Sequence, residues 1–159
     1  MGLDASVYCA CFETGRLRSP PPAGVEVYVC EDGSLDCRGG DQRSDLAFDA
    51  WLFSKACDHE NGTLLHHRIG NIALVSLLRE ELGRRAEIFP TILARVIYNG
   101  SHCGDWLTMG EVQAVQLELG CLRTHRCGSV QAQDLVQTFR RQMEELAVCS
   151  LQVGKPISF

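Results

Sequence analysis

Hydrophobic and polar residues alternate through the first part of the chain, which is typical of β-strands. Residues 3–12 carry a hydrophobic side chain at every second position, and residues 25–30 repeat the pattern. Asp32-Gly33 favours a tight hairpin turn, after which residues 35–38 can add a short third strand. We therefore expect the first quarter of the chain to form a small antiparallel sheet.

The hydrophobic spacing then changes from every second residue to every third or fourth, which predicts helices. A first helix is expected from a cap at Ser44 or Asp45 to about Cys57. Residues 58–63 are polar and predict a loop. A second helix is expected over residues 67–82, where apolar residues cover a broad face and a glycine follows the last turn.

Three more helical segments follow in the second half of the chain. Pro90 suits the first turn of a helix that reaches about Tyr98, although the β-branched residues in this segment make a strand the alternative. Thr108 and Glu111 form a capping-box pattern ahead of the next helix. Ser129 is expected to cap the last and longest helix, whose apolar stripe is the most regular in the chain.

The chain ends with a short apolar segment after a helix breaker. Gly154-Lys155-Pro156 stops the last helix, and residues 157–159 are expected either to dock on the domain or to add to the edge of the sheet. The pattern as a whole predicts that residues 1–159 form a single domain of the α+β class. In this fold a small N-terminal antiparallel sheet packs against four to five helices.

Composition and charge narrow the classes of function. Of the 159 residues, 45% are hydrophobic and 22% are charged, which are ordinary values for a globular domain. The formal net charge of −5, with basic residues spread along the chain, offers no cluster of Lys and Arg for a phosphate backbone or an anionic membrane. We therefore expect neither nucleic acid nor membrane as a partner, and the pattern leaves the oligomeric state open.

The expected location follows from the absence of export signals in the pattern. The first 12 residues lack the basic and long apolar regions of a signal peptide. No apolar run approaches the about 18 residues that a bilayer span needs. We expect a cytoplasmic protein, in which most cysteines are reduced and buried. The number of cysteines is odd, so they cannot all pair within the chain. The cysteines are Cys9, Cys11, Cys30, Cys37, Cys57, Cys103, Cys121, Cys127 and Cys149.

Two close-spaced pairs of soft ligands make a candidate metal site. Cys9 and Cys11 lie on one face of the first strand, and Cys57 and His59 lie at the end of the first helix. Zinc takes four such ligands, so a site forms if the strand end meets the helix end. The one-residue spacers are shorter than the usual two to four. The alternative is that these are buried free thiols and a surface histidine. No other cofactor is expected.

A candidate anion or ligand pocket lies at the predicted start of the second helix. His66, His67 and Arg68 offer charge and hydrogen-bond donors there, together with Asn71. The first turn of a helix also presents unpaired N–H groups that suit an anion. The alternative is a solvated first turn with no ligand.

The loop at 101–106 is the second part of that candidate pocket. His102 and Asp105 can orient one another, with Cys103 as a nucleophile. In the plainer interpretation Asp105 accepts hydrogen bonds from backbone N–H groups and Trp106 fills the core. A shared pocket requires this loop to lie beside His66 and His67.

Four blocks of sequence resemble a group of small uncharacterised bacterial proteins. They are the opening Met-Gly-Leu-Asp-Ala-Ser-Val-Tyr-Cys and the segments at 65–71, 97–107 and 154–159. Similar chains occur among presumed immunity proteins of bacterial toxin systems. The resemblance implies a protein that binds another protein, and no catalytic residues are carried over from it.

Three functions remain for the structure to separate. The leading expectation is a non-enzymatic intracellular protein-binding domain, for which the resemblance implies an immunity-like role. Its acidic charge suits a basic partner. The second is a small enzyme or ligand-binding domain with a histidine-lined pocket. The third is a structural zinc-binding protein that uses the two cysteine-containing pairs.

Overall fold

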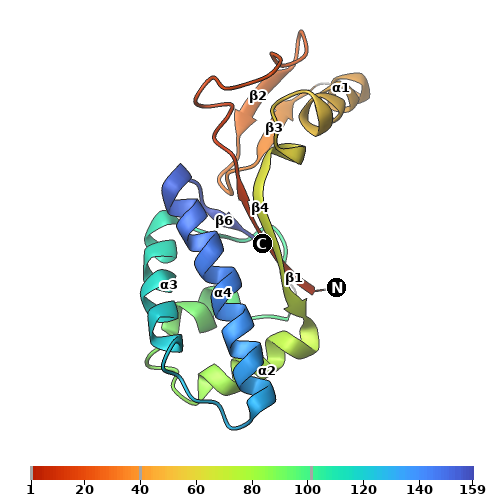
Figure 1. Cartoon of the computed structure of the whole chain (residues 1–159). Coiled ribbons are helices and arrows are strands. Elements are labelled where there is room, and N and C mark those ends of the chain that lie inside the picture. The colour runs from red at the N-terminus through yellow and green to blue at the C-terminus, as the bar shows by residue number, and fades with distance from the viewer. Residues whose placement is uncertain (1, 40, 101) are drawn as a thin grey trace.

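The computed structural model of the chain describes residues 2–39, 41–100 and 102–159. Met1, Gly40 and Ser101 lie outside the described residues, so the first residue of the 101–106 loop is not placed. The described part is an α+β fold with a four-stranded antiparallel sheet, a separate two-stranded sheet and helices (Figure 1). The predicted fold class is confirmed.

The four-stranded sheet combines segments from both ends of the chain. Its strand order is β4 (Thr63–Asn71), β1 (Gly2–Tyr8), β6 (Ile157–Ser158) and β5 (Trp106–Leu107). Every neighbouring pair is antiparallel. The C-terminal tail is expected from the sequence either to dock on the domain or to add to the edge of the sheet. It joins the sheet as β6, but it lies between β1 and β5 and not at an edge.

Helices cover one face of this sheet and create the main hydrophobic core. They are α2 (Ile72–Gly83), α3 (Met109–Leu122) and α4 (Val130–Val153), and α4 crosses the sheet along β1 and β4 (Figure 1). Within the described residues, none of the helices is both long and apolar enough to cross a membrane. The side chains that β1 buries against the helices are Leu3, Ala5 and Val7.

A second, smaller lobe lies beyond the end of the β1–β4 pair. It contains the hairpin of β2 (Glu26–Val29) and β3 (Leu35–Arg38), and the helix α1 (Gln42–Ser54) (Figure 1). The prediction that β1 shares one sheet with these strands is wrong. The proline-rich segment at 20–22 cannot donate ladder hydrogen bonds, and β1 pairs instead with β4. The lobe has its own small core, built on Phe48, Trp51 and Ala56.

The second helix begins later than predicted, because its expected first turns form β4. Burial alternates along this strand, which pairs with β1 over its length. The apolar residues at 65 and 69 are four positions apart, which fits a helical face as well as one face of a strand, so the local pattern is ambiguous. Long-range pairing decides it. Asn71 then caps α2, and its side chain accepts a hydrogen bond from the Leu74 N–H at 2.9 Å.

Other predicted helix ends are partly confirmed. The capping box of Thr108 and Glu111 opens α3, and Ser129 caps α4 as expected. The cap of α1 is Asp41, whose carboxylate accepts from the Ser44 N–H, so the expected caps at 44 and 45 are wrong. The segment expected to be helical over 90–98 contains a short π-helical stretch, η2 (Ile92–Val96).

The C-terminal segment also holds the smaller lobe in place. Lys155 is buried, and its ammonium donates to the Gly33 carbonyl oxygen at 3.2 Å and pairs with Glu13. The Ser158 hydroxyl lies 3.1 Å from Asp32 Oδ2 in the same hairpin turn. A buried ammonium is tolerated only when its charge and its protons are satisfied in this way. The hairpin is therefore anchored to the sheet from one side.

The buried carboxylate of Glu118 supports a testable prediction about this fold. Glu118 on α3 is 8% exposed and accepts from the backbone N–H groups of Thr91 and Ile92, both at 2.8 Å. Glu118→Gln replaces one acceptor oxygen with a donor and leaves a buried N–H unpaired. We expect a loss of about 1–3 kcal/mol in the free energy of unfolding, measured by urea denaturation. The exposed neighbour variant Gln116→Ala should stay within about 0.5 kcal/mol of the parent, and equal stability of Glu118→Gln would contradict the role.

Candidate metal centre

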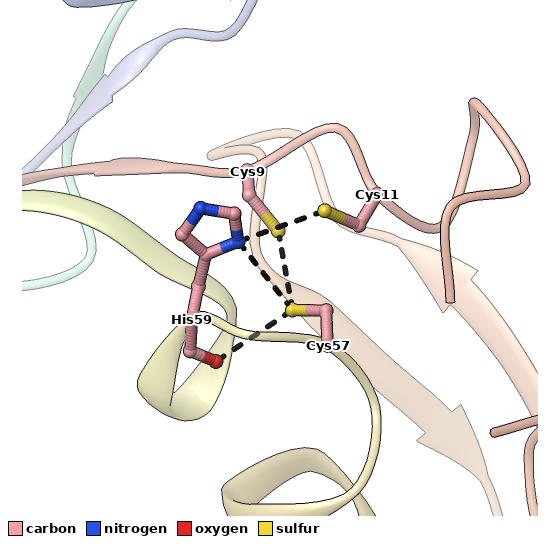
Figure 2. Close-up of side chains that lie close together, drawn as sticks. All are labelled: Cys9, Cys11, Cys57 and His59. Atoms are coloured by element: carbon pink, nitrogen blue, oxygen red, sulfur yellow. Dashed lines mark hydrogen bonds between the residues drawn. The ribbon is translucent and has the colours of Figure 1, made fainter. Parts of the chain in front are cut away.

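Four ligating side chains meet between the main body and the smaller lobe. Cys9 and Cys11 follow β1, while Cys57 and His59 lie in the connection between α1 and the turn η1 (Glu60–Gly62). Figure 2 shows the three sulfur atoms and the imidazole pointing toward a common centre. The ligand atoms all lie within 4.8 Å of one another. This cluster can hold a metal ion, and the condition set for the site, that the strand end meets the helix end, is fulfilled.

Three pairs of ligand atoms in the cluster are separated by similar distances. Cys9 Sγ lies 3.8 Å from Cys57 Sγ. His59 Nδ1 lies 3.6 Å from Cys11 Sγ and 3.6 Å from Cys57 Sγ. The other pairs of ligand atoms lie within 4.8 Å of one another, so the four atoms form one compact group. His59 faces the cluster with Nδ1, while Nε2 points away (Figure 2).

The pairing of β1 with β4 brings His59 back to the cysteines. The ladder continues beyond β1, since the Cys9 N–H donates to the Gly62 carbonyl oxygen at 2.8 Å. Asn61 and Gly62 have φ values of 50° and 68°, in the left-handed region that closes a tight turn. The Gly62 N–H then donates to the His59 carbonyl oxygen at 3.1 Å. This turn reverses the chain and directs His59 toward the end of β1.

Contacts at the end of α1 position Cys57 from the other side. The Arg18 N–H donates to the Ala56 carbonyl oxygen at 2.8 Å, and the Trp51 indole N–H donates to the Ser19 carbonyl oxygen at 3.1 Å. Leu17 packs against both the cysteines and the small core of the lobe. The segment that follows Cys11 is therefore fastened along the end of α1, directly beside Cys57.

Burial controls the protonation of the three thiols. Cys9 and Cys57 are 8% exposed and Cys11 is 9% exposed. Desolvation raises the pKa of each of these cysteines above its ordinary value. The thiols are therefore protonated at neutral pH unless a cation stabilises the thiolates. A cavity of about 370 Å³, which Arg16 and Asp58 also line, opens onto the cluster and gives an ion access to it.

The residues of the predicted anion pocket lie on a strand instead of a helix start. His66 is exposed on β4 and is hydrogen-bonded to Ser6 at 3.0 Å. His67 donates from Nε2 to Glu145 on α4 at 2.8 Å. Arg68 is exposed, and the side chain of Asn71 is used as the cap of α2. No helix N-terminus is present at 66–68, so that part of the prediction is wrong.

The histidine of the 101–106 loop has a structural environment. His102 donates from Nε2 to the Val96 carbonyl oxygen at 2.8 Å, and its ring lies between Tyr98 and Phe159. Asp105 Oδ2 lies 3.2 Å from His102 Nδ1 but outside hydrogen-bond geometry, and it accepts from the Tyr98 hydroxyl instead. Cys103 is exposed. His102 Nδ1 has no hydrogen-bond partner among the described residues, and no hydrogen bond joins the His102 ring to the Cys103 thiol.

The two histidine groups do not share one pocket. His66 and His67 lie on β4, at one edge of the four-stranded sheet. Asp105 directly precedes β5, at the opposite edge, and its loop is hydrogen-bonded to Phe159. Two strands, β1 and β6, separate the groups, which places them about 14 Å apart at the usual strand spacing.

A groove that sequence reasoning missed runs between α2 and α4. Its volume is about 790 Å³, and both Arg68 and Asn71 contribute to it at the end of β4. The sequence shows the apolar faces of both helices but not the gap left where they diverge. The apolar side chains of its wall include Leu74, Leu77, Leu135 and Phe139.

No model of a protein family, no curated protein and no solved structure matches this chain. The resemblance to presumed immunity proteins of bacterial toxin systems therefore stays a prediction, as does the cytoplasmic location. The interpretation of function depends on the geometry of the chain itself.

Proposed function

We propose that this chain is a zinc protein in which Cys9, Cys11, Cys57 and His59 hold one structural Zn²⁺. The observation that carries the proposal is the set of distances within the cluster. In a tetrahedral site, Zn–S bonds of about 2.3 Å and a Zn–N bond of about 2.0–2.1 Å place two sulfurs about 3.8 Å apart and a sulfur and a nitrogen about 3.6 Å apart. The separation of 3.8 Å between the sulfurs of Cys9 and Cys57 and the separations of 3.6 Å from His59 Nδ1 to the sulfurs of Cys11 and Cys57 agree with this geometry. The other three pairs of ligand atoms lie within 4.8 Å.

The donor set favours zinc and a structural role. Thiolate and imidazole ligands select zinc over calcium and magnesium, which take oxygen ligands. Four protein ligands complete a tetrahedron and leave no open position for a substrate. A catalytic zinc site keeps one such position, so the cluster is better suited to holding segments of the chain together.

The cluster lies where a zinc ion would stabilise the attachment of the smaller lobe to the main body. The lobe of α1, β2 and β3 has a core of few residues, too small to be stable alone. The cysteines form a third hydrophobic group between that core and the sheet, in contact with Leu17 of the lobe and Leu64 of β4. A bound zinc ion would connect the end of β1 to the end of α1 and fix the lobe to the body.

A specific surface feature favours protein binding as the function of the lobe that the zinc holds. Leu46 and Phe53 on α1 are 61% and 58% exposed, and their seven-residue separation puts them on the same face of the helix. Asp45 and Asp49 are exposed beside them. An apolar face with an acidic rim suits a partner that presents an apolar groove bordered by basic residues.

Metal content tests the zinc site directly. Protein purified with its thiols reduced and without chelators should contain one equivalent of zinc attributable to this cluster, measured by elemental analysis. Cys57→Ser should lose that equivalent, and its unfolding midpoint should fall because zinc no longer favours the folded state. The expected loss is about 3 kcal/mol if free zinc exceeds the dissociation constant a hundredfold.

The matched control is Cys103→Ser, which changes an exposed cysteine outside the cluster. This variant should keep its full zinc content and stability. Parent protein with less than one equivalent of zinc after reconstitution, or a Cys57→Ser variant with unchanged metal content, would exclude the structural zinc site.

The pH dependence of zinc affinity is a second test. Burial raises the pKa of Cys9, Cys11 and Cys57, so the metal-free thiols are protonated at neutral pH, and zinc must displace up to three protons. Protons and zinc compete, so affinity must fall as the pH falls, by up to about a thousandfold per pH unit. Competition with a chromophoric chelator measures the affinity, and proton release into a weak buffer gives the count. An affinity independent of pH would show that thiolates are not the ligands.

The proposed binding face is tested with charged variants of α1. Coexpression of the chain with the product of a neighbouring gene should yield a stable complex. Leu46→Asp and Phe53→Asp should each weaken that complex at least about thirtyfold, as expected for a central interface residue. Leu117→Asp, at an exposed position on α3, is the control and should bind normally. A complex with equal affinity in all three variants would place the interface elsewhere.

A further inference from the structure

A second group of ligating side chains lies at the far end of the helical layer. Glu81 is in the last turns of α2, and His125 and Cys127 are in the connection between α3 and α4. A ring nitrogen of His125, a carboxylate oxygen of Glu81 and the sulfur of Cys127 all lie within 4.8 Å of one another. This cluster is separate from the Cys9 cluster, which lies at the other end of α4 (Figure 1).

The His125 ring is buried without a partner for one of its nitrogens. The residue is 6% exposed, and Nε2 has no hydrogen-bond partner among the residues that the structure describes. The edge of the ring packs against Phe89, with centroids 5.5 Å apart and planes at 82°. The great majority of buried polar atoms have a hydrogen-bond partner, so an unpartnered nitrogen beside a thiol and a carboxylate suits a metal ligand.

The protein holds the connection in a fixed shape. The amide of Gln133 on α4 accepts from the Cys127 N–H and donates to the His125 carbonyl oxygen, both at 3.1 Å. Glu81 is 9% exposed, and its carboxylate is oriented by Arg84, with a contact of 3.1 Å. The Arg84 side chain is half exposed and can turn toward solvent when a cation takes the carboxylate. The three ligands are thus positioned by neighbours that are not themselves ligands.

We propose that Glu81, His125 and Cys127 form a second metal site, which takes a divalent transition metal of the zinc class and leaves its fourth position to an external ligand. The mixture of nitrogen, sulfur and oxygen donors suits zinc and its neighbours in the first transition row. One thiolate and one carboxylate balance the charge of a divalent ion, which makes burial of the ion favourable. Three protein ligands and one open position are the pattern of zinc sites that bind or activate a small molecule.

The groove between α2 and α4 supplies a route to the open position. Glu81 belongs both to the cluster and to the wall of the groove, so the metal site borders the groove. Leu77 and Leu135 line the same groove with apolar side chains. The external ligand is therefore a small molecule with an apolar body and a metal-binding head group, such as a carboxylate or a thiol. This site does not depend on the structural zinc of the other cluster.

The experiment compares metal content among variants after reconstitution with zinc and removal of excess metal. The parent should hold two equivalents, and Cys127→Ser and Glu81→Gln should each hold one. Cys121→Ser changes an exposed cysteine on α3 and should hold two. Circular dichroism of each variant checks that it is folded, and Glu81→Gln is included because it preserves the size of a buried side chain.

The outcomes separate this site from the structural zinc. One outcome is a parent protein that holds only one equivalent of zinc, with Cys57→Ser retaining it and Cys127→Ser losing it. That result would support the Glu81–His125–Cys127 site and exclude the structural zinc site at Cys9, Cys11, Cys57 and His59. A Cys127→Ser or Glu81→Gln variant with the full metal content of the parent would overturn the proposal. In cobalt-loaded parent protein, azide should change the absorption spectrum, and Glu81→Gln should abolish that change. A spectrum that azide leaves unaltered would overturn the open fourth position.

Discussion

The antiparallel pairing of β1 with β4 is the contact on which the rest of the structure depends. It joins segments about sixty residues apart in sequence, as in the register of Ser6 with His66. The ladder continues through the bond from Cys9 to Gly62, so the ends of both strands reach the same place. When one face of a sheet is buried, a slip of one residue would turn the apolar side chains of a strand toward solvent, so the hydrophobic pattern fixes the register. That register brings the two ligand pairs together.

The cysteine cluster occupies a place where hydrophobic packing is thin. The main core extends under the four-stranded sheet, while the smaller lobe buries few apolar residues around Trp51. Folding such a lobe costs conformational entropy, and a small core offsets only part of that cost. Small domains commonly bind a metal ion to supply the rest of the stability. Buried Lys155 secures the hairpin side of the lobe. In the proposed zinc site the thiols would secure the α1 side, so the two anchors would lie on different elements.

Histidine has different roles in different parts of this chain, and residue type alone does not reveal them. His67 pairs with Glu145 and joins β4 to α4, and His102 is enclosed by aromatic rings next to the C-terminus. Each is held through its Nε2, and the Nδ1 of His102 faces Asp105 and not a sulfur atom. His59 and His125 differ, because each faces sulfur and has a ring nitrogen available to a metal. The two proposed metal sites rest on this difference.

The sequence by itself determined the elements whose signals are local. These include the α4 stripe with its Ser129 cap, the Thr108–Glu111 capping box, the hairpin at 26–38 and the two ligand pairs at 9–11 and 57–59. Only the tertiary structure decided that residues 63–71 form a strand, because their apolar spacing suits a helix equally and the partner strand is distant in sequence. The tertiary structure alone also brings Glu81 together with His125 and Cys127. No spacing rule relates residues whose contact is set by how α2 packs beside the α3–α4 connection.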